Sequence, residues 1–383
     1  MTADRGIDDV EFREQVRKTL HRVVAPRAQA AERSGCLPRS VWLELGQAGL
    51  LASPHSGPDF PRTGIILEEL GRLGHCGIRA SLAVSAYMAG YYLDRFAATE
   101  LAELVLAPAR AGAAILSLAI SEATSGTDLR GVDTVLRRQP NGEHILTGTK
   151  SYVANGCSAD FFLVIARDAD QPPHIGALGL SMIVVGGDQP GVERARWDAD
   201  VWRSADLATV AFHDVTIAPS RFVGRKGRAG WLLAEALEFE RLVAGLLALG
   251  GVGATLAELR DWLNTREVAG AALAANSSIR QRAGQLWAEY VTVRACAADA
   301  VAAQTEGRRI GTIATALKWC ATELDKRAAA MSVQLHGAHG FARASPVARH
   351  ARDAAAATVA GGASEHLLDV LGRAYLDSGM TIQ

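Results

Sequence analysis

The hydrophobic period changes twice along this chain of 383 residues, and these changes constrain the fold more than any other feature. Between about Val10 and Gly112, apolar residues recur three and four positions apart, which places them on one face of a helix. Between about Ala113 and Val223, short β-rich runs alternate with Gly, Asp, Asn and Pro turn signals. From about Gly227, long Ala- and Leu-rich segments return with helical period. The pattern predicts an α+β multidomain fold.

The predicted domain boundaries follow from these changes of period. We expect an N-terminal α-helical domain over 1–112, a small central β-barrel or sheet domain over 113–226, and a C-terminal helical bundle over 227–383. With 49% hydrophobic residues, a chain of this length buries enough apolar surface for two or three domains.

Charge and cysteine spacing exclude several classes of protein. Lys and Arg number 40 against 41 Asp and Glu, and no dense basic run is interleaved with aromatic residues, so we expect no nucleic-acid partner. The N-terminus is charged, and we find no apolar stretch of the roughly 18 residues that would suggest a membrane span. The five cysteines lack metal-ligand spacing, so no metal site is predicted. We expect a cytoplasmic protein.

Glu240 is a carboxylate inside the apolar run WLLAEALEFERLVAGLLALGG. At helical spacing it should point toward a hydrophobic space, on a face shared with Ala236, Leu237, Val243, Ala244 and Leu247. Burial disfavours a charged carboxylate, and this is how a general base is tuned. The alternative is a structural glutamate that pairs with a neighbouring arginine or caps another element.

Several tracts, in order along the chain, resemble motifs of the acyl-CoA dehydrogenase family. LSLAISEATSGTDL and GTKSYVANGCSADFFLVIARD are similar to the family's T-E-P-x-A-G-S-D and G-x-K-x-W-I-T-N-G-x-x-A-D segments. QLHGAHGF, PVARHARD and GGASE are similar to its C-terminal Q-x-x-G-G-x-G-Y, P-x-x-R-x-x-R-D and E-G-T-S-E segments. Ordered matches over nearly the whole chain are far more specific than one glycine pattern.

The resemblance implies a flavoenzyme in which FAD lies between the β domain and a C-terminal four-helix bundle. In this family a base removes the α-proton of an acyl thioester, and flavin N5 takes the β-hydride to give an α,β-unsaturated thioester. A backbone N–H polarises the thioester carbonyl, and the matching residue here is Gly361.

Gly361 is also the main departure from the family pattern, because most members carry their catalytic glutamate there. The isovaleryl-CoA and long-chain branches, and the related prolyl-carrier-protein dehydrogenases, place the base instead in a segment similar to L-E-R-L. FERL at Phe239 to Leu242 matches that segment, and its carboxylate is Glu240. The small residue at 361 and the carboxylate at 240 are therefore complementary.

The resemblance assigns several cofactor contacts, but at some of these positions the side chain differs from the family's. Residues matching flavin contacts in the β domain are Ile120, Ser121, Thr127, Tyr152, Val153 and Ala154. Ala154 lacks the hydroxyl that would bind flavin N5. Arg266 matches a pyrophosphate ligand supplied by a neighbouring subunit, although its companions are Val268 and Ala269, and Gln334 and Gly337 match the adenine and pyrophosphate end. Ala363 replaces a threonine of the flavin cavity.

Three functions stay open at this point. The first is an FAD-dependent acyl-CoA or acyl-carrier-protein dehydrogenase that uses Glu240, with a branched or cyclic acyl group and a place in specialised metabolism. The second is a flavin monooxygenase of the same fold, and the third is a noncatalytic binding paralogue. The dehydrogenase needs an electron-transfer partner or oxygen to reoxidise its flavin, and the family's habit suggests a homodimer or homotetramer.

Overall fold

The computed structural model describes residues 2–52, 54–171 and 179–377. By contacts the chain forms two compact units. The helical unit comprises Met1–His21, Ser56–Cys76 and Glu238–Gln383, and the sheet unit comprises Arg22–His55 and Gly77–Leu237.

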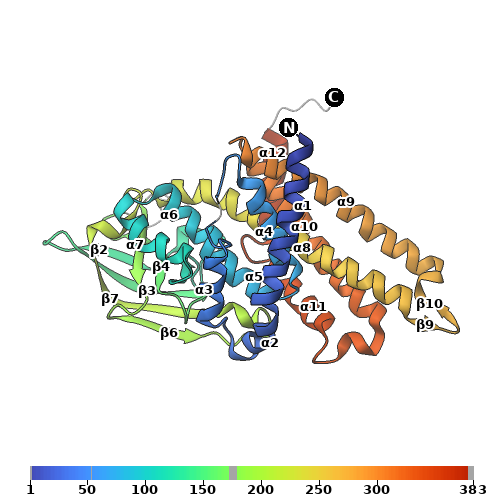
Figure 1. Ribbon diagram of the computed structural model, residues 1–383. Coiled ribbons are helices and arrows are strands. Elements are labelled where there is room, and N and C mark those ends of the chain that lie inside the picture. Colours follow the sequence, from blue (N-terminus) through green and yellow to red (C-terminus); the bar gives the residue numbers. More distant parts are fainter. Residues whose placement is uncertain (1, 53, 172–178, 378–383) are drawn as a thin grey trace. The chain divides into compact units, whose positions relative to one another are not determined.

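The sheet unit is built on eight strands among the described residues, paired in the order β6-β7-β3-β2-β4-β5-β8, with β1 parallel to β4 (Figure 1). All eight lie in the region where short β-rich runs predict strands. Their bounds are β1 Leu116–Ala119, β2 Val135–Arg138, β3 His144–Val153, β4 Phe161–Asp168, β5 Leu180–Gly186, β6 Val192–Arg196, β7 Ala208–Ile217 and β8 Phe222–Val223.

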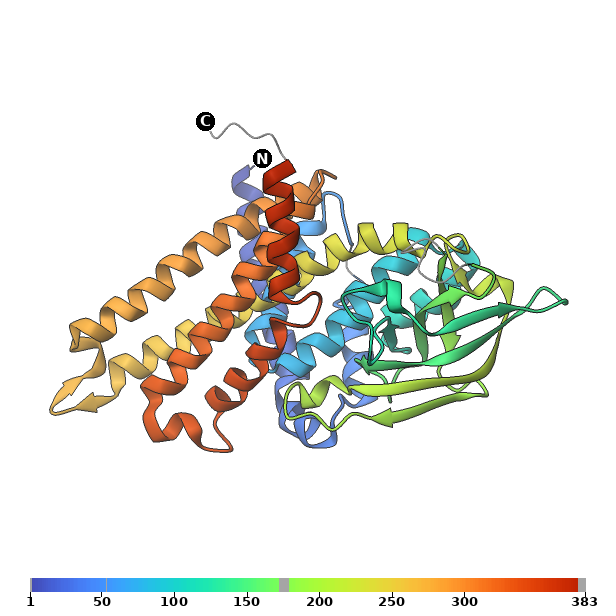
Figure 2. The ribbon, with the colours of Figure 1, turned by 180° about the vertical axis from the view of Figure 1, so that it is seen from behind.

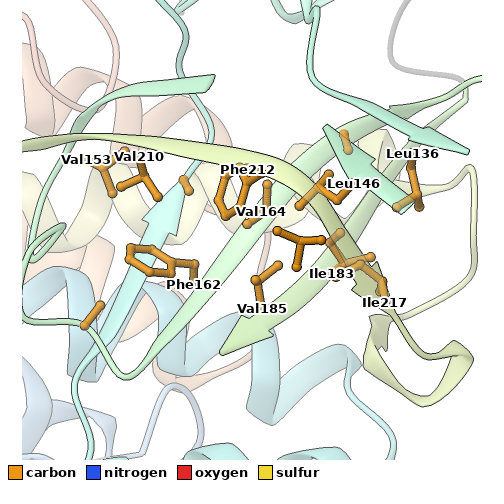
Figure 3. Packing of buried hydrophobic residues seen from close by; sticks show 14 residues of the cluster. Leu136, Leu146, Val153, Phe162, Val164, Ile183, Val185, Val210, Phe212 and Ile217 are labelled. Carbon is orange, nitrogen blue, oxygen red and sulfur yellow. The ribbon is translucent and has the colours of Figure 1, made fainter. Parts of the chain in front are cut away.

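The sheet curls around one hydrophobic core. Figure 3 shows Phe162 and Val164 of β4 facing Val210 and Phe212 of β7, although these strands are not neighbours in the pairing order. The rings of Phe162 and Phe212 lie 6.4 Å apart at an angle of 83°, an edge-to-face contact that favours this packing. The sheet therefore curls so that strands distant in the pairing order share one core, while β6 and β8 remain its two edges.

Helices of the same unit pack beside this layer. Ser85 accepts a hydrogen bond of 2.9 Å from the main-chain N–H of Leu116, so a π-helical turn is joined directly to the first residue of β1. These helices are α2 Ala25–Ser34, α3 Arg39–Gln47, α5 Cys76–Ala83, the π-helix Val84–Ala89, α6 Gly90–Phe96 and α7 Thr99–Arg110.

In the helical unit, long helices run side by side, and a short hairpin joins α8 to α9 at one end (Figures 1 and 2). Gly245 of α8 packs so closely on α10 that an added Cβ would lie 2.7 Å from Leu317 Cγ. The elements that lie wholly or mostly in this unit are α1 Thr2–Val23, α4 Phe60–Arg72, α8 Ala229–Thr265, β9 Glu267–Val268, β10 Ala271–Ala272, α9 Ser277–Thr305, α10 Gly311–His336, α11 Pro346–Ala357 and α12 Ser364–Asp377. The predicted order of helical, sheet and helical domains is confirmed.

The prediction about membrane-spanning length is wrong for α8. An 18-residue window of Ala229–Thr265 has a mean hydropathy of 1.8, which satisfies the length and composition of a membrane span. However, 72% of that window is buried inside the fold, as in the core helix of a globular protein.

Candidate active site

In the sheet unit, the turn after β1 lies against the end of β3. Lys150 Nζ donates to the carbonyl of Ile120 at 2.9 Å, and the N–H of Ser151 donates to the carbonyl of Ser121 at 2.9 Å. The structure therefore brings together Ile120, Ser121 and the strand end that carries Tyr152, three of the residues matched to flavin contacts.

A buried ion pair holds this turn. Glu122 receives hydrogen bonds from Lys150 Nζ at 2.7 Å, from the N–H groups of Asp133 and Thr134 at 2.7 and 3.0 Å, and from the Thr134 hydroxyl at 2.6 Å. Burial alone would raise the pKa of Glu122, but the charge of Lys150 and these hydrogen bonds bring it below its usual value. Burial lowers the pKa of Lys150 to about 8, against the attraction of Glu122. The carboxylate organises the turn.

The residues matched to the flavin ring differ in what they expose. Tyr152 has a positive φ of 59°, is 50% exposed, and contacts Trp197 edge-to-face at 4.9 Å between ring centroids. Val153 is 1% exposed because its side chain is part of the sheet core, so only its backbone is left for a cofactor. Ala154 accepts a hydrogen bond from Ser117 through its carbonyl, and Thr127 is exposed after the Ser121 turn.

In the helical unit, the ends of α8 and α10 meet. The indole N–H of Trp262 donates to the carbonyl of Leu335 at 2.9 Å, and the Trp262 ring stacks on His336 with centroids 4.3 Å apart. This contact sets the exposed Arg266, one turn after Trp262, beside the helix end that carries the exposed Gln334. Gly337 follows with a φ of 56° and no heavy atom within 4 Å of an added Cβ.

Glu240 lies in α8 and is 7% exposed. Phe239 and Leu242 beside it are also buried, and the ring of Phe239 packs against Phe60 at 6.0 Å. Arg241 donates to the hydroxyl of Thr315 at 3.0 Å. The predicted burial of this carboxylate is thus observed.

Gly361 lies in the loop between α11 and α12, with φ of +67°, followed by Gly362 with φ of +108°. No heavy atom lies within 4 Å of a Cβ added at Gly361. Lys318 of α10 donates to the carbonyls of Gly362 at 2.7 Å and Thr358 at 3.3 Å. Because α10 also contacts α8 at Gly245, one helix links the loop of Gly361 to the helix of Glu240.

Comparison with known proteins gives three matches that together cover most of the chain. Residues 8–113 match the acyl-CoA dehydrogenase N-terminal domain, residues 117–215 the middle domain, and residues 228–376 the C-terminal domain. The chain belongs to the acyl-CoA dehydrogenase family. It is therefore an oxidoreductase that acts on acyl-CoA, and its cofactor is FAD.

Individual relatives are distant but align over nearly the full length. The chain is 27% identical to long-chain specific acyl-CoA dehydrogenase of Rattus norvegicus over 94% of this chain and 85% of that protein. It is 25% identical to isovaleryl-CoA dehydrogenase of Pongo abelii over 95% and 88%. The crystal structure of acyl-CoA dehydrogenase from Geobacillus kaustophilus superposes with a TM-score of 0.89 at 25% identity, covering 97% and 98%. The predicted fold is confirmed.

The residues matched to FAD contacts fit such a group in several respects. Arg266 and Gln334 present an exposed guanidinium and amide at one end of the helical unit, where they can bind phosphate oxygens. The open backbone at Gly337 allows close approach of a ligand. Tyr152 offers an exposed aromatic edge in the sheet unit. The missing hydroxyl at Ala154 removes one hydrogen bond, which changes binding by about 1 kcal/mol.

Sequence reasoning missed the residues that hold these elements in place. Asn155, with φ of 59°, donates to the carbonyls of Ser81 and Leu116 at 3.0 and 3.1 Å and so ties β3 to α5 and β1. The lysine in GTKSYVAN and the asparagine after it belong to the matched motif, which could have indicated Lys150 and Asn155. Nothing in the local sequence of α10 indicates the role of Lys318.

Proposed function

We propose that this protein is an FAD-dependent acyl-thioester dehydrogenase in which Glu240 removes the α-proton and the N–H of Gly361 binds the thioester carbonyl. The residues matched to its ring and pyrophosphate would hold FAD, which would supply the acceptor for the β-hydride, so that an α,β-unsaturated thioester results. The division into domains 1–112, 113–226 and 227–383 belongs to the same proposal.

One observation carries the assignment of the base. The residue at 361 has no side chain, while the buried carboxylate of Glu240 lies on a helix linked to the same loop through α10. A glutamate at 361 would be strained, because L residues rarely adopt a φ of +67°. Glu240 supplies the carboxylate that Gly361 cannot.

The open space beside Gly361 also bears on the acyl group. With no heavy atom within 4 Å of an added Cβ, a branched or cyclic acyl chain meets no side chain from this residue. We therefore favour such substrates over straight chains, carried on CoA or on an acyl-carrier protein, within specialised metabolism in the cytoplasm. The electron acceptor is an electron-transfer partner or oxygen, and the active form is a homodimer or homotetramer.

The experiment is an anaerobic titration of the FAD-loaded protein with short, branched and cyclic acyl thioesters. Wild-type flavin absorbance should bleach, whereas Glu240→Gln should bind FAD and reduce it about 10²- to 10⁴-fold more slowly, since the amide cannot accept a proton. Glu238→Gln is the matched control, because Glu238 lies two residues earlier on α8 and points about 200° around the helix from Glu240.

Other outcomes would replace the proposal with a specific alternative. Equal rates in wild type and Glu240→Gln would place the base elsewhere. Bound flavin that no thioester reduces would favour a monooxygenase of the same fold. A protein that cannot be loaded with FAD would be a binding paralogue.

A further inference from the structure

Lys318 is a buried cation on α10 whose ammonium group contacts two carbonyls of a single loop. Its side chain is 0% exposed, and Nζ donates to Gly362 at 2.7 Å and to Thr358 at 3.3 Å. A buried ammonium needs hydrogen-bond acceptors, so these two carbonyls fix where the loop lies relative to α10. Gly361 lies between them in sequence.

Other hydrogen bonds hold the residues that flank Gly361. The N–H groups of Val359 and Ala360 both donate to the carbonyl of Ala356 at 3.1 Å. On one side, the carbonyl of Thr358 also accepts the N–H of Ser364 at 3.0 Å, and the Ser364 hydroxyl donates to Glu323 at 2.6 Å. Gly361 itself is exposed and has no side chain to pack. Two consecutive glycines with positive φ have wide conformational freedom, so the direction of the Gly361 N–H depends on the contacts that flank it.

We propose that Lys318 is a positioning residue that holds the N–H of Gly361 in the direction of the thioester carbonyl, acting through the carbonyls of Thr358 and Gly362. This inference rests on the proposed function of Gly361. A donor aimed at the developing negative charge must be fixed before the reaction, and a shift of about 1 Å can lower a rate about 10²-fold.

Four influences set the charge of Lys318. Burial is the largest and lowers its pKa to about 8; Glu323 of the same helix raises it, Arg241 of α8 lowers it, and Glu365 of α12 raises it. Charge-assisted hydrogen bonds are roughly twice as strong as neutral ones. The contact with the loop is therefore stronger below pH 8, where the ammonium form prevails, than above it.

The test compares Lys318→Met and Lys318→Gln with wild type in the FAD-loaded enzyme, using an artificial electron acceptor. Lys318→Met should lower kcat about 10- to 100-fold and change KM for the acyl thioester by less than about threefold, because the carbonyl contact matters most in the transition state. Lys318→Gln, which keeps two N–H donors, should recover part of kcat. The control is Lys326→Met on the same helix. The Lys326 side chain is 48% exposed and pairs with Glu323 at 3.6 Å. Since exposed pairs contribute little, this variant should change kcat by less than about twofold.

Two further readouts separate positioning from a general loss of stability. The ratio of wild-type to Lys318→Met kcat should fall as the pH rises from 7 to 9.5, since wild type loses its charged donor over that range. Backbone hydrogen exchange over 358–364 should be at least about tenfold faster in Lys318→Met, with α8 unchanged. If Lys318→Met unfolds or loses FAD, an intermediate kcat for Lys318→Gln supports the proposal, and a wild-type kcat overturns it.

The two possible failures can be told apart. Unchanged kcat and unchanged exchange in a folded Lys318→Met enzyme would overturn the role of Lys318. A wild-type enzyme that no acyl thioester reduces would instead overturn the proposed function, whatever the exchange of the loop shows.

Discussion

Two lysines with fully buried side chains hold turns in the two units, but they do so with different partners. Lys150 in the sheet unit binds the carboxylate of Glu122 at 2.7 Å and one carbonyl. Lys318 in the helical unit binds two carbonyls, and Glu323, Arg241 and Glu365 act on its ammonium through their charges. Burial lowers the pKa of each lysine to about 8.

This difference distinguishes Lys150, whose charge has a structural role, from Lys318, whose charge can position a functional loop. The pair of Lys150 and Glu122 is neutral overall, so its electrostatic potential at other residues is small. Glu122 also accepts three further hydrogen bonds, and the arrangement therefore fixes a turn. Lys318 interacts mainly with dipoles, so its positive charge is not cancelled by a directly bonded anion. A charge of that kind both orders the loop of Gly361 and responds to pH.

The largest loss of stability should come from removing the carboxylate of the Lys150–Glu122 ion pair. Glu122→Gln leaves Lys150 as a buried cation without its carboxylate, so we expect the unfolding free energy to fall by about 3–5 kcal/mol. Lys318→Met removes a charge and leaves only carbonyls without a donor, so it should cost about 1–3 kcal/mol. Urea unfolding of both variants measures the two values, and the double variant Glu122→Gln with Lys150→Met should recover part of the loss. A larger loss of unfolding free energy for Lys318→Met than for Glu122→Gln would contradict this comparison of the two lysines.

The pH dependence of the unfolding free energy tests the role of Lys318 more closely. A lysine with a folded pKa of about 8 and an ordinary pKa of 10.5 binds fewer protons in the folded state between those values. Its contribution to stability is therefore fully present above pH 10.5 and lost as the pH falls through about 8. The destabilisation caused by Lys318→Met should grow by about 1–3 kcal/mol between pH 7.5 and 10.5, as followed by urea unfolding at each pH.

The loss of stability in Lys318→Met thus grows as the pH rises, whereas the loss of kcat in the same variant should shrink. A residue that served stability alone would show both trends in the same direction. Lys326→Met, at an exposed position, should give unfolding curves parallel to those of wild type throughout. Parallel curves for Lys318→Met as well would contradict the lowered pKa.

The smallest effect concerns the second restraint on the loop. Ser364→Ala removes the hydroxyl that donates to Glu323 at 2.6 Å, while the main-chain bond to Thr358 remains. We expect a loss of about 1 kcal/mol in thermal unfolding and a fall in kcat of less than about threefold, because Lys318 still fixes both carbonyls. If kcat fell as far as in Lys318→Met, Ser364 rather than Lys318 would dominate the loop.

Part of the proposed site can be predicted because residue spacing and short motifs are local properties of the sequence. The burial of Glu240 follows from helical spacing within an apolar run. Ordered motifs predict the cofactor contacts Ile120, Ser121, Thr127, Tyr152, Val153 and Ala154. Val153 shows the limit of this reasoning: its place in the motif suggests a cofactor contact, but its side chain is in the sheet core. The expectation that no apolar stretch reaches membrane-spanning length also failed, because α8 contains an apolar window that tertiary packing buries.

The sequence by itself determined the order of helical and sheet domains, the family, and the complementary residues Gly361 and Glu240, because hydrophobic period and motif order are local properties of the chain. Only the tertiary structure decided that Lys318 holds the loop of Gly361, across 40 and 44 residues of sequence. A lysine in a helix has no local signal for burial, since its partners are main-chain carbonyls that any sequence could supply. Long-range packing of α10 against the loop selects them.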